Sequence, residues 1–221
     1  MEFLFQDENL LIINKPAGLL TISDGYNKSL PNVKSFLEES FGRCWIVHRL
    51  DKETSGVLII ALNDITHRHL NQQFEKRNVQ KKYHAIVMGV PKEDQFNINS
   101  SLRVNGDRKH RTIVDEHKGK PAQSQVTILK QYSEYALLLV SPKTGYTHQI
   151  RAHLSSFGYP ILADPLYSKA QNPFPQIINR TALHAYEITF HHPITNQCLQ
   201  ITAPYPDDFN SLVQFLNEKT G

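Results

Sequence analysis

The chain has 221 residues, of which 40% are hydrophobic and 20% charged, so it can bury a full core without disulfides or metals, and global disorder is excluded. The formal net charge of +3 permits a polyanionic partner but does not require one. The two cysteines form no CxxC motif, which excludes a zinc ribbon and favours a reducing compartment. The N-terminus lacks a signal-peptide pattern, and no apolar run approaches the ~20 residues that span a bilayer, so we expect a cytoplasmic protein.

The hydrophobic pattern predicts a chain with more strands than helices. Buried or alternating runs predict strands at 10–14, 56–62, 82–88, 125–129, 136–140, 187–190 and 199–203. Periodicity, Pro31, Gly42 and a capping Asp64 predict helices at 31–41, 64–77, 147–157 and 207–217. The helices do not alternate strictly with the strands, so the predicted class is α+β with a mixed, mainly antiparallel central sheet flanked by helices and loops. The length suits one domain over 1–221, built as a single unit or as two packed halves.

The densest group of polar residues lies in VHRLDKETSG, at 47–56, just before a buried strand. The group consists of His48, Arg49, Asp51, Thr54 and Ser55. Polar residues in a loop that leads into a core strand are held in place by a rigid scaffold. The alternative is an ordinary turn in which Asp51, Thr54 and Ser55 bond backbone groups, and the spacing alone favours that alternative.

A second segment, KKYHAIVMG at 81–89, reads as a strand with Lys81 and Tyr83 on one face. A tyrosine beside a basic side chain can stack a nucleobase while the cation meets a phosphate. The alternative is an ordinary half-buried tyrosine, which is the commoner fate of Tyr in a strand.

A third segment, PKTGYTHQIRAHL at 142–154, leads into a predicted helix. On that helix His148 and Arg151 are three residues apart and share a face, whereas Ile150 and Leu154 form the core-facing stripe. Arg151 is therefore expected to point away from the core and to meet an anion. The alternative is a plain surface arginine.

In order and spacing, HRLDKETSG, KKYHA and THQIRAHL resemble the three signature segments of the RluA-type pseudouridine synthases. The resemblance extends to DENLLIINKPAGL near the N-terminus and to PILADPLY and LHAYEITFHHP further on, so it covers 7–204. Many relatives carry a small RNA-binding domain before the catalytic one. This chain begins directly at the catalytic segment, so we expect the stand-alone form.

The resemblance implies an isomerase, an RNA pseudouridine synthase acting on ribosomal or transfer RNA. The reaction breaks the N1–C1′ bond of uridine, turns the base and rejoins it through C5. It involves no net redox change and no transfer to water, so neither a cofactor nor a metal is expected. We also expect a monomer that does not associate with membranes.

The resemblance also assigns the catalytic residues. Asp51 would be the carboxylate that acts at C1′ of a flipped-out nucleotide, and Arg151 would pair with it and keep it ionised. Tyr83 would stack under the base and take part in proton removal from C5. Whether Asp51 attacks covalently or assists elimination stays open.

The implied substrate-binding set consists of Arg49, Ile150, Lys81 and His48. Ile150 would pack on the other face of the base, and Arg49 would fill the gap that the flipped nucleotide leaves. Lys81 would support the site or a phosphate.

Three positions depart from the usual family pattern. Tyr146 stands where Arg is common, Ala163 where Gly precedes the landmark aspartate, and Ser168 where Gly follows the landmark tyrosine. None of them replaces a residue assigned to chemistry. They leave the identity of the RNA and of its target uridine open.

Two basic stretches could meet RNA phosphates. The range 68–82 holds five Lys or Arg and one acid, and the range 103–120 holds six Lys or Arg and three acids. Charge runs of this kind are usually solvated surface. Because both flank the signature segments, we favour a surface that faces phosphates.

The sequence also allows two rival functions. A metal-dependent hydrolase could use His67 with His69, or His148 with His153, but no HExxH or CxxC spacing occurs. A non-enzymatic RNA-binding protein would leave an intact set of signature residues unexplained.

Overall fold

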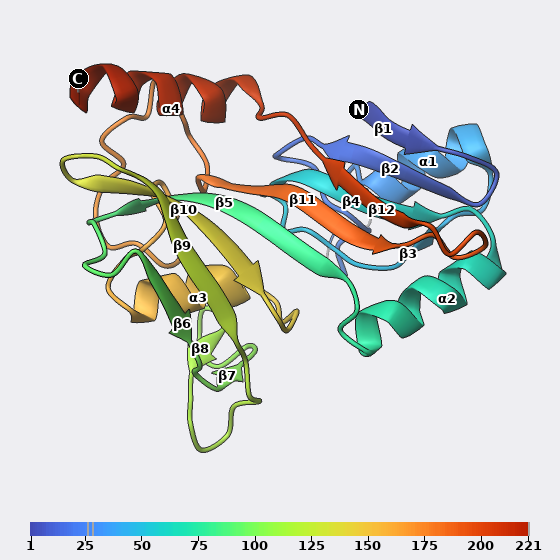
Figure 1. Ribbon diagram of the computed structural model, residues 1–221, viewed down its shortest axis with the longest axis horizontal. Helices are drawn as coiled ribbons and strands as arrows, with labels where there is room; N and C mark the ends of the chain where they lie inside the picture. Colours follow the sequence, from blue (N-terminus) through green and yellow to red (C-terminus); the bar gives the residue numbers. More distant parts are fainter. Residues whose placement is uncertain (26, 28, 221) are drawn as a thin grey trace. The chain divides into compact units, whose positions relative to one another are not determined.

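The computed structural model describes residues 1–25, 27 and 29–220, and the chain divides into two compact units. Unit 1 comprises Met1–Lys81 and Ala185–Pro204, and unit 2 comprises Lys82–His184 and Tyr205–Gly221. Figure 1 labels the elements of both. Each unit is described by itself below.

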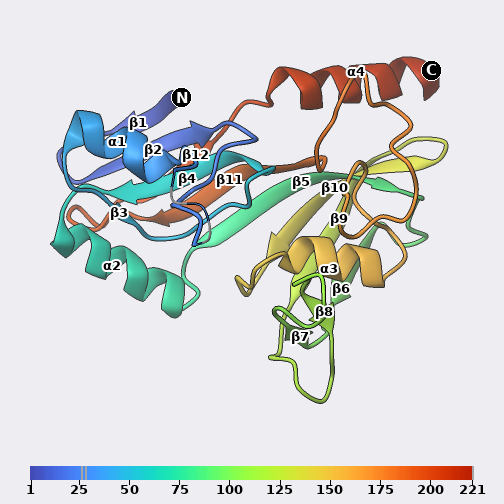
Figure 2. The same ribbon diagram turned by 180° about the vertical axis from the view of Figure 1, so that it is seen from behind.

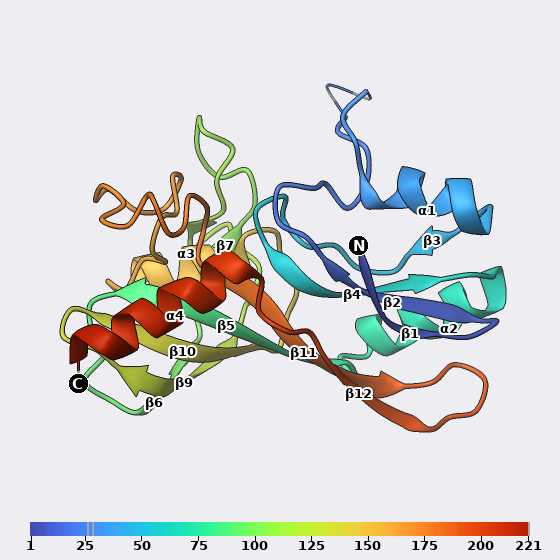
Figure 3. The ribbon, with the colours of Figure 1, turned by 90° about the horizontal axis from the view of Figure 1, so that it is seen from above.

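Unit 1 is built on a sheet of mostly antiparallel strands. They are β1 (Glu2–Gln6), β2 (Leu10–Lys15), β3 (Trp45–Ile46), β4 (Ser55–Ala61), β12 (Cys198–Thr202) and most of β11 (Leu183–His191). The order is β1-β2-β4-β11, with β3 beside β4 and β12 beside β11. Figure 3 shows the β11–β12 hairpin. The four strands predicted in this part of the chain are confirmed, whereas β1 and β3 were not predicted.

The helices of unit 1 are α1 (Val33–Phe41) and α2 (Asp64–Glu75). Both have an asparagine cap, because the side chain of Asn32 accepts from Ser35 N and that of Asn63 from Thr66 N. The predicted start at Pro31 and the predicted cap at Asp64 were therefore wrong by one or two residues. Gly42 ends α1 with a φ of 69°, as predicted.

The core of unit 1 lies around β4, whose seven residues are all buried. Leu70 of α2 packs with the apolar side chains of β2, β4 and β11. Gly56 has a φ of 115°, and a Cβ there would lie 2.1 Å from the carbonyl oxygen of Ala185. Only glycine permits this close approach of the β4 and β11 backbones. The last residue of HRLDKETSG is thus required by packing.

Unit 2 contains most of β5 (Gln80–Met88), β6 (Gln95–Ile98), β9 (Ser124–Gln131) and β10 (Tyr135–Pro142), in the antiparallel order β5-β10-β9-β6. The short strands β7 (Leu102–Arg103) and β8 (Ile113–Val114) pair separately. Figure 2 shows them on an extended arm, residues 102–120, near α3. The predicted strands of this part are confirmed, and β6, β7 and β8 were not predicted.

The helices of unit 2 are α3 (Gln149–Ser156) and α4 (Asp207–Thr220). His148 has a left-handed φ of 54° and serves as the N-cap of α3, so the helix begins two residues later than predicted and His148 is not on it. Ile150 and Leu154 pack into the core against β10 and α4, as the predicted stripe requires. Gly158, with a φ of 88°, follows the end of α3, which confirms the predicted stop.

The predicted α+β class with a mixed, mainly antiparallel sheet is confirmed. In the part of the chain that the structure describes, no helix is both long and apolar enough to cross a membrane.

Candidate active site

The backbone that carries Asp51 is fixed from both sides within unit 1. The hydroxyl of Thr21 donates to Leu50 O at 2.9 Å and accepts from Leu50 N at 3.2 Å. On the other side, Gly18 N donates to Lys52 O at 2.8 Å. Thr54 N closes the turn on Asp51 O at 3.1 Å. Asp51 itself is half-buried, so a rigid loop presents a carboxylate that solvent can still reach.

The buried ammonium of Lys15 reinforces this loop. Lys15 is 0% exposed, and its Nζ donates to Pro16 O at 2.8 Å, to Leu19 O at 2.7 Å and to Lys52 O at 3.2 Å. A buried charge is costly unless hydrogen bonds compensate it, and these carbonyls supply that compensation. Lys15 therefore ties the end of β2 to the residue that follows Asp51.

His48 fastens the start of the same loop to β4. Its Nε2 accepts from Ile59 N at 3.0 Å, and its ring stacks on Phe74 of α2 with centroids 5.0 Å apart. Burial, aided by the positive charge of Lys81, lowers the pKa of His48 to about 3. Burial also lowers the pKa of Lys81 itself. His48 is thus a neutral imidazole whose Nε2 is already used by the backbone.

This environment predicts a pH-dependent contribution of His48 to stability. The folded pKa lies below the ordinary value of 6.5, so the contribution is complete above pH 6.5 and is lost as the pH falls toward 3. Between pH 7 and pH 5 the loss should be about 2 kcal/mol. Denaturant unfolding of wild type and His48→Gln at both pH values measures it, because the stability difference between them should shrink by that amount.

The control is Gln197→Ala, which alters an exposed side chain of the same unit that does not titrate. Its stability difference from wild type should stay constant over the same pH range. An equal shrinkage for both variants would contradict the neutral state assigned to His48.

The remaining sequence-predicted residues are divided between the units. Arg49 and Lys81 lie in unit 1 with Asp51 and His48, and the side chain of Arg49 is exposed. Tyr83, Ile150 and Arg151 lie in unit 2. The pairing of Asp51 with Arg151 stays a prediction.

Tyr83 and Ile150 belong to the same apolar cluster of unit 2. Tyr83 lies on β5 opposite Val140 of β10 and is half-buried at the border of the cluster. Ile150, on the first turn of α3, is 6% exposed. The core therefore supports both the ring of Tyr83 and the side chain of Ile150. Residues that hold a base by packing need such support.

Arg151 is buried rather than outward-facing, which corrects the prediction from the helical pattern. It is 6% exposed, and its Nε and Nη2 donate to the two carboxylate oxygens of Asp164 at 2.7 and 2.9 Å. Asp164 also accepts from Leu166 N at 2.9 Å and Tyr167 N at 3.1 Å. The anion that Arg151 meets in unit 2 is this carboxylate, and the bidentate geometry fixes the plane of the guanidinium.

Tyr167 joins three parts of unit 2 around Arg151. The Cζ of Arg151 lies 5.0 Å from the centroid of the Tyr167 ring. Its hydroxyl accepts from Thr112 N of the arm at 2.8 Å and lies 3.1 Å from Nδ1 of His148. Burial raises the pKa of the Tyr167 hydroxyl, which therefore stays protonated at neutral pH. The arm, the start of α3 and Arg151 thus share one aromatic neighbour.

The turn that carries Asp164 begins at a residue in the left-handed region. Ala163 has a φ of 58°, and a left-handed conformation costs a residue with a Cβ about 1–2 kcal/mol. This is the position where the family commonly has glycine, so the structure gives the reason for that preference. The bonds to Asp164 hold the turn in place here.

Three of the four histidines that could pair as metal ligands, His67, His148 and His153, have other partners. His67 bonds Asn71 and stacks on Trp45, and buried His153 bonds Ser124 Oγ and Ser100 O. Within residues 1–25, 27 and 29–220, no three His, Cys, Asp or Glu side chains are grouped so that they could hold a metal ion.

Sequence reasoning missed the residues that support the site. Asp164 and Tyr167 appeared only as landmarks in PILADPLY, and Lys15 and Thr21 were not singled out. The available signal was an aspartate and a lysine inside otherwise apolar segments, since such residues are rarely buried unless paired.

Comparisons with known proteins agree with this fold. Residues 9–156 match the family model described as RNA pseudouridylate synthase. The dual-specificity RNA pseudouridine synthase RluA of Pasteurella multocida is 34% identical over 205 residues, which are 92% of this chain and 93% of that protein. The uncharacterized RNA pseudouridine synthase YhcT of Bacillus subtilis is 36% identical over 222 residues, 96% of this chain and 71% of that protein.

The solved structure of human RNA pseudouridylate synthase domain containing 4 superimposes with a TM-score of 0.79 at 25% identity, covering 98% of this chain and 93% of that chain. The fold and the signature segments thus define an RNA-modifying isomerase. The chain belongs to the RNA pseudouridylate synthase family, and the resemblance to its RluA-type members is confirmed. It converts uridine in RNA to pseudouridine.

Proposed function

We propose that the protein isomerises specific uridines in structured ribosomal or transfer RNA, with Asp51 acting at C1′ of a flipped-out nucleotide. The observation that carries the proposal is the fixed backbone around Asp51. Buried Lys15 and Thr21 hold Leu50 and Lys52 on either side of it. A carboxylate that acts on one carbon atom needs this degree of positioning.

In the proposed reaction Asp51 either attacks C1′ or assists departure of the base. The N1–C1′ bond breaks, the base turns, a C5–C1′ bond forms, and the proton at C5 is finally replaced by one at N1. Tyr83 stacks under the base and takes part in removing that C5 proton. Arg151, whose guanidinium is oriented by Asp164, pairs with Asp51 and holds it in place.

The proposed substrate-binding residues are Arg49, Ile150, Lys81 and His48. The exposed side chain of Arg49 supports its role in filling the gap in the RNA stack. The hydrogen bond of His48 to Ile59 supports an indirect role, in which His48 holds the loop that carries Arg49 and Asp51.

The proposal that the substrate is ribosomal or transfer RNA rests on the names of related proteins. The Pasteurella multocida relative is a dual-specificity enzyme, and a relative from Zymomonas mobilis is named ribosomal large subunit pseudouridine synthase D, at 33% identity over 231 residues. We further propose a single catalytic domain over 1–221 that acts as a monomer in the cytoplasm without cofactor or metal.

Tritium release tests the proposed function. Ribosomal and transfer RNA transcripts that carry tritium at C5 of uridine are incubated with the protein, because forming the C5–C1′ bond expels that hydrogen into water. We expect release from at least one transcript, followed by mapping of the modified position. A protein that releases no tritium from either class of RNA would refute the proposal.

Replacement of Tyr83 by phenylalanine separates its two proposed roles. Tyr83→Phe keeps the ring but removes the hydroxyl, so RNA binding should be retained while turnover falls by about 10²–10⁴-fold. Single-turnover tritium release and RNA affinity measure the two effects. The control Tyr159→Phe removes another half-buried hydroxyl of unit 2 and should leave turnover unchanged. Full activity of Tyr83→Phe would reduce Tyr83 to a stacking platform.

A further inference from the structure

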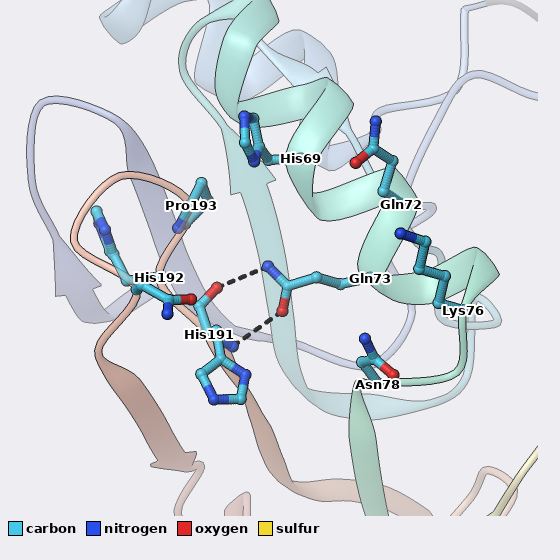
Figure 4. A pocket seen from close by; sticks show the side chains of 9 residues that line it. His69, Gln72, Gln73, Lys76, Asn78, His191, His192 and Pro193 are labelled. Atoms are coloured by element: carbon cyan, nitrogen blue, oxygen red, sulfur yellow. Dashed lines mark hydrogen bonds between the residues drawn. The ribbon is translucent and has the colours of Figure 1, made fainter.

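Unit 1 contains a polar pocket that belongs to none of the signature segments. Its volume is about 200 Å³, and Figure 4 shows its two walls. One wall is the outer side of α2 and the residues after it, and the other is the turn between β11 and β12. We call it the α2 pocket, lined among others by His69, Gln72, Gln73, Lys76, Asn78 and His191.

The walls of the α2 pocket are fixed to each other. The side-chain amide of Gln73 donates to His191 O at 2.7 Å and accepts from His191 N at 2.9 Å (Figure 4). Next to it, Nε2 of His192 bonds Asp7 at 2.8 Å, while its Nδ1 accepts from Ile194 N and Thr195 N. The pocket is therefore preformed, and a ligand would not have to order it.

The lining favours an anion. Lys76 contributes a positive charge, and the exposed side chains of His69, Gln72 and Asn78 contribute hydrogen-bond donors. None of the residues that line the pocket in the described chain is acidic. The nearby carboxylate of Asp7 is already bound by two backbone amides and His192. Lys76 also offsets the partial negative charge at the end of α2.

We propose that the α2 pocket binds a backbone phosphate of the RNA substrate at a nucleotide other than the target uridine. This rests on the proposed function, since RNA is the polyanion that such an enzyme must hold. A phosphate accepts several hydrogen bonds and carries one negative charge, which matches a lysine surrounded by neutral donors. Such a contact sets the register of the RNA on the protein and reads no sequence. The contact would use Lys76, which lies in the basic stretch 68–82 but outside the signature segments.

Charge reversal in the pocket provides the test. Lys76→Glu and the control Lys92→Glu, an exposed lysine in unit 2, are compared with wild type. Binding of unmodified tRNA and of a ribosomal RNA transcript is measured between about 50 and 200 mM salt. For Lys76→Glu we expect several-fold weaker binding at low salt and a log–log slope of affinity against salt that is smaller by about 1. Binding of Lys76→Glu that equals that of Lys92→Glu would overturn the proposal.

Two further measurements locate the effect. RNA should protect Lys76 from chemical acetylation in the wild-type protein, and protection by inorganic phosphate without protection by RNA would overturn the proposal in favour of a small-anion pocket. Tritium release is recorded in parallel. If wild type releases tritium while Lys76→Glu binds normally, the pocket proposal fails and the proposed function stands. If wild type releases none, the function itself fails.

Discussion

Asp51→Asn should fold, bind RNA nearly as well as wild type and form no detectable pseudouridine, a loss of at least about 10⁴-fold in turnover. The substitution keeps the size and hydrogen-bonding capacity of the side chain and removes its charge. The bonds that fix the loop are made by the backbone of Leu50, Asp51 and Lys52, so they do not depend on that charge. We therefore expect the free energy of unfolding to change by less than about 1 kcal/mol.

The control for this experiment is Glu53→Gln, which makes the same chemical change two residues away in the same loop. Glu53→Gln should retain turnover. For both variants, tritium release measures activity and denaturant unfolding measures stability, so the two effects are separated. Loss of folding in Asp51→Asn would support the reading of Asp51 as a turn residue. Retained catalysis would overturn the mechanism and each role that depends on it.

Much of the fold could be predicted because its central strands are continuous apolar runs. β4 is buried along its whole length, so GVLIIAL is recognisable without any knowledge of its neighbours. The short strands β7 and β8 and the edge strands β1 and β6 were missed. Their residues are partly exposed, and their pairing depends on partners elsewhere in the chain.

The identities of the signature residues could be predicted, but their supports could not. A lysine next to a proline reads as a surface residue, yet Lys15 is fully buried because three carbonyls from two loops converge on its ammonium. Helical spacing predicts which residues share a face. It does not reveal that His148 precedes the first residue of the helix and has a left-handed conformation. Likewise, Arg151 is drawn inward by Asp164, which lies beyond the end of the helix.

The same ion pair makes Asp164 a positioning residue for the proposed chemistry. Asp164 is buried, and it binds Arg151 through both oxygens while it also accepts two backbone amides of its own turn. Removing one partner of a buried ion pair leaves the other charge uncompensated, which costs about 3–5 kcal/mol. Stability alone therefore cannot reveal whether Asp164 also orients Arg151 for catalysis.

Unit 2 offers a matched pair that separates the two effects. Arg180, which is also buried, binds Asp208 through Nε at 2.7 Å and Nη2 at 2.8 Å. Asp164→Asn and Asp208→Asn should both lower stability, but only Asp164→Asn should lower kcat, by about 10²-fold or more, because a misplaced guanidinium cannot serve in the role proposed for Arg151. Tritium release at saturating RNA, at a temperature where both variants are folded, measures the difference. Equal kcat values in the two variants would reduce the Arg151–Asp164 pair to a structural contact. Its loss would then affect turnover no more than loss of the Arg180–Asp208 pair does.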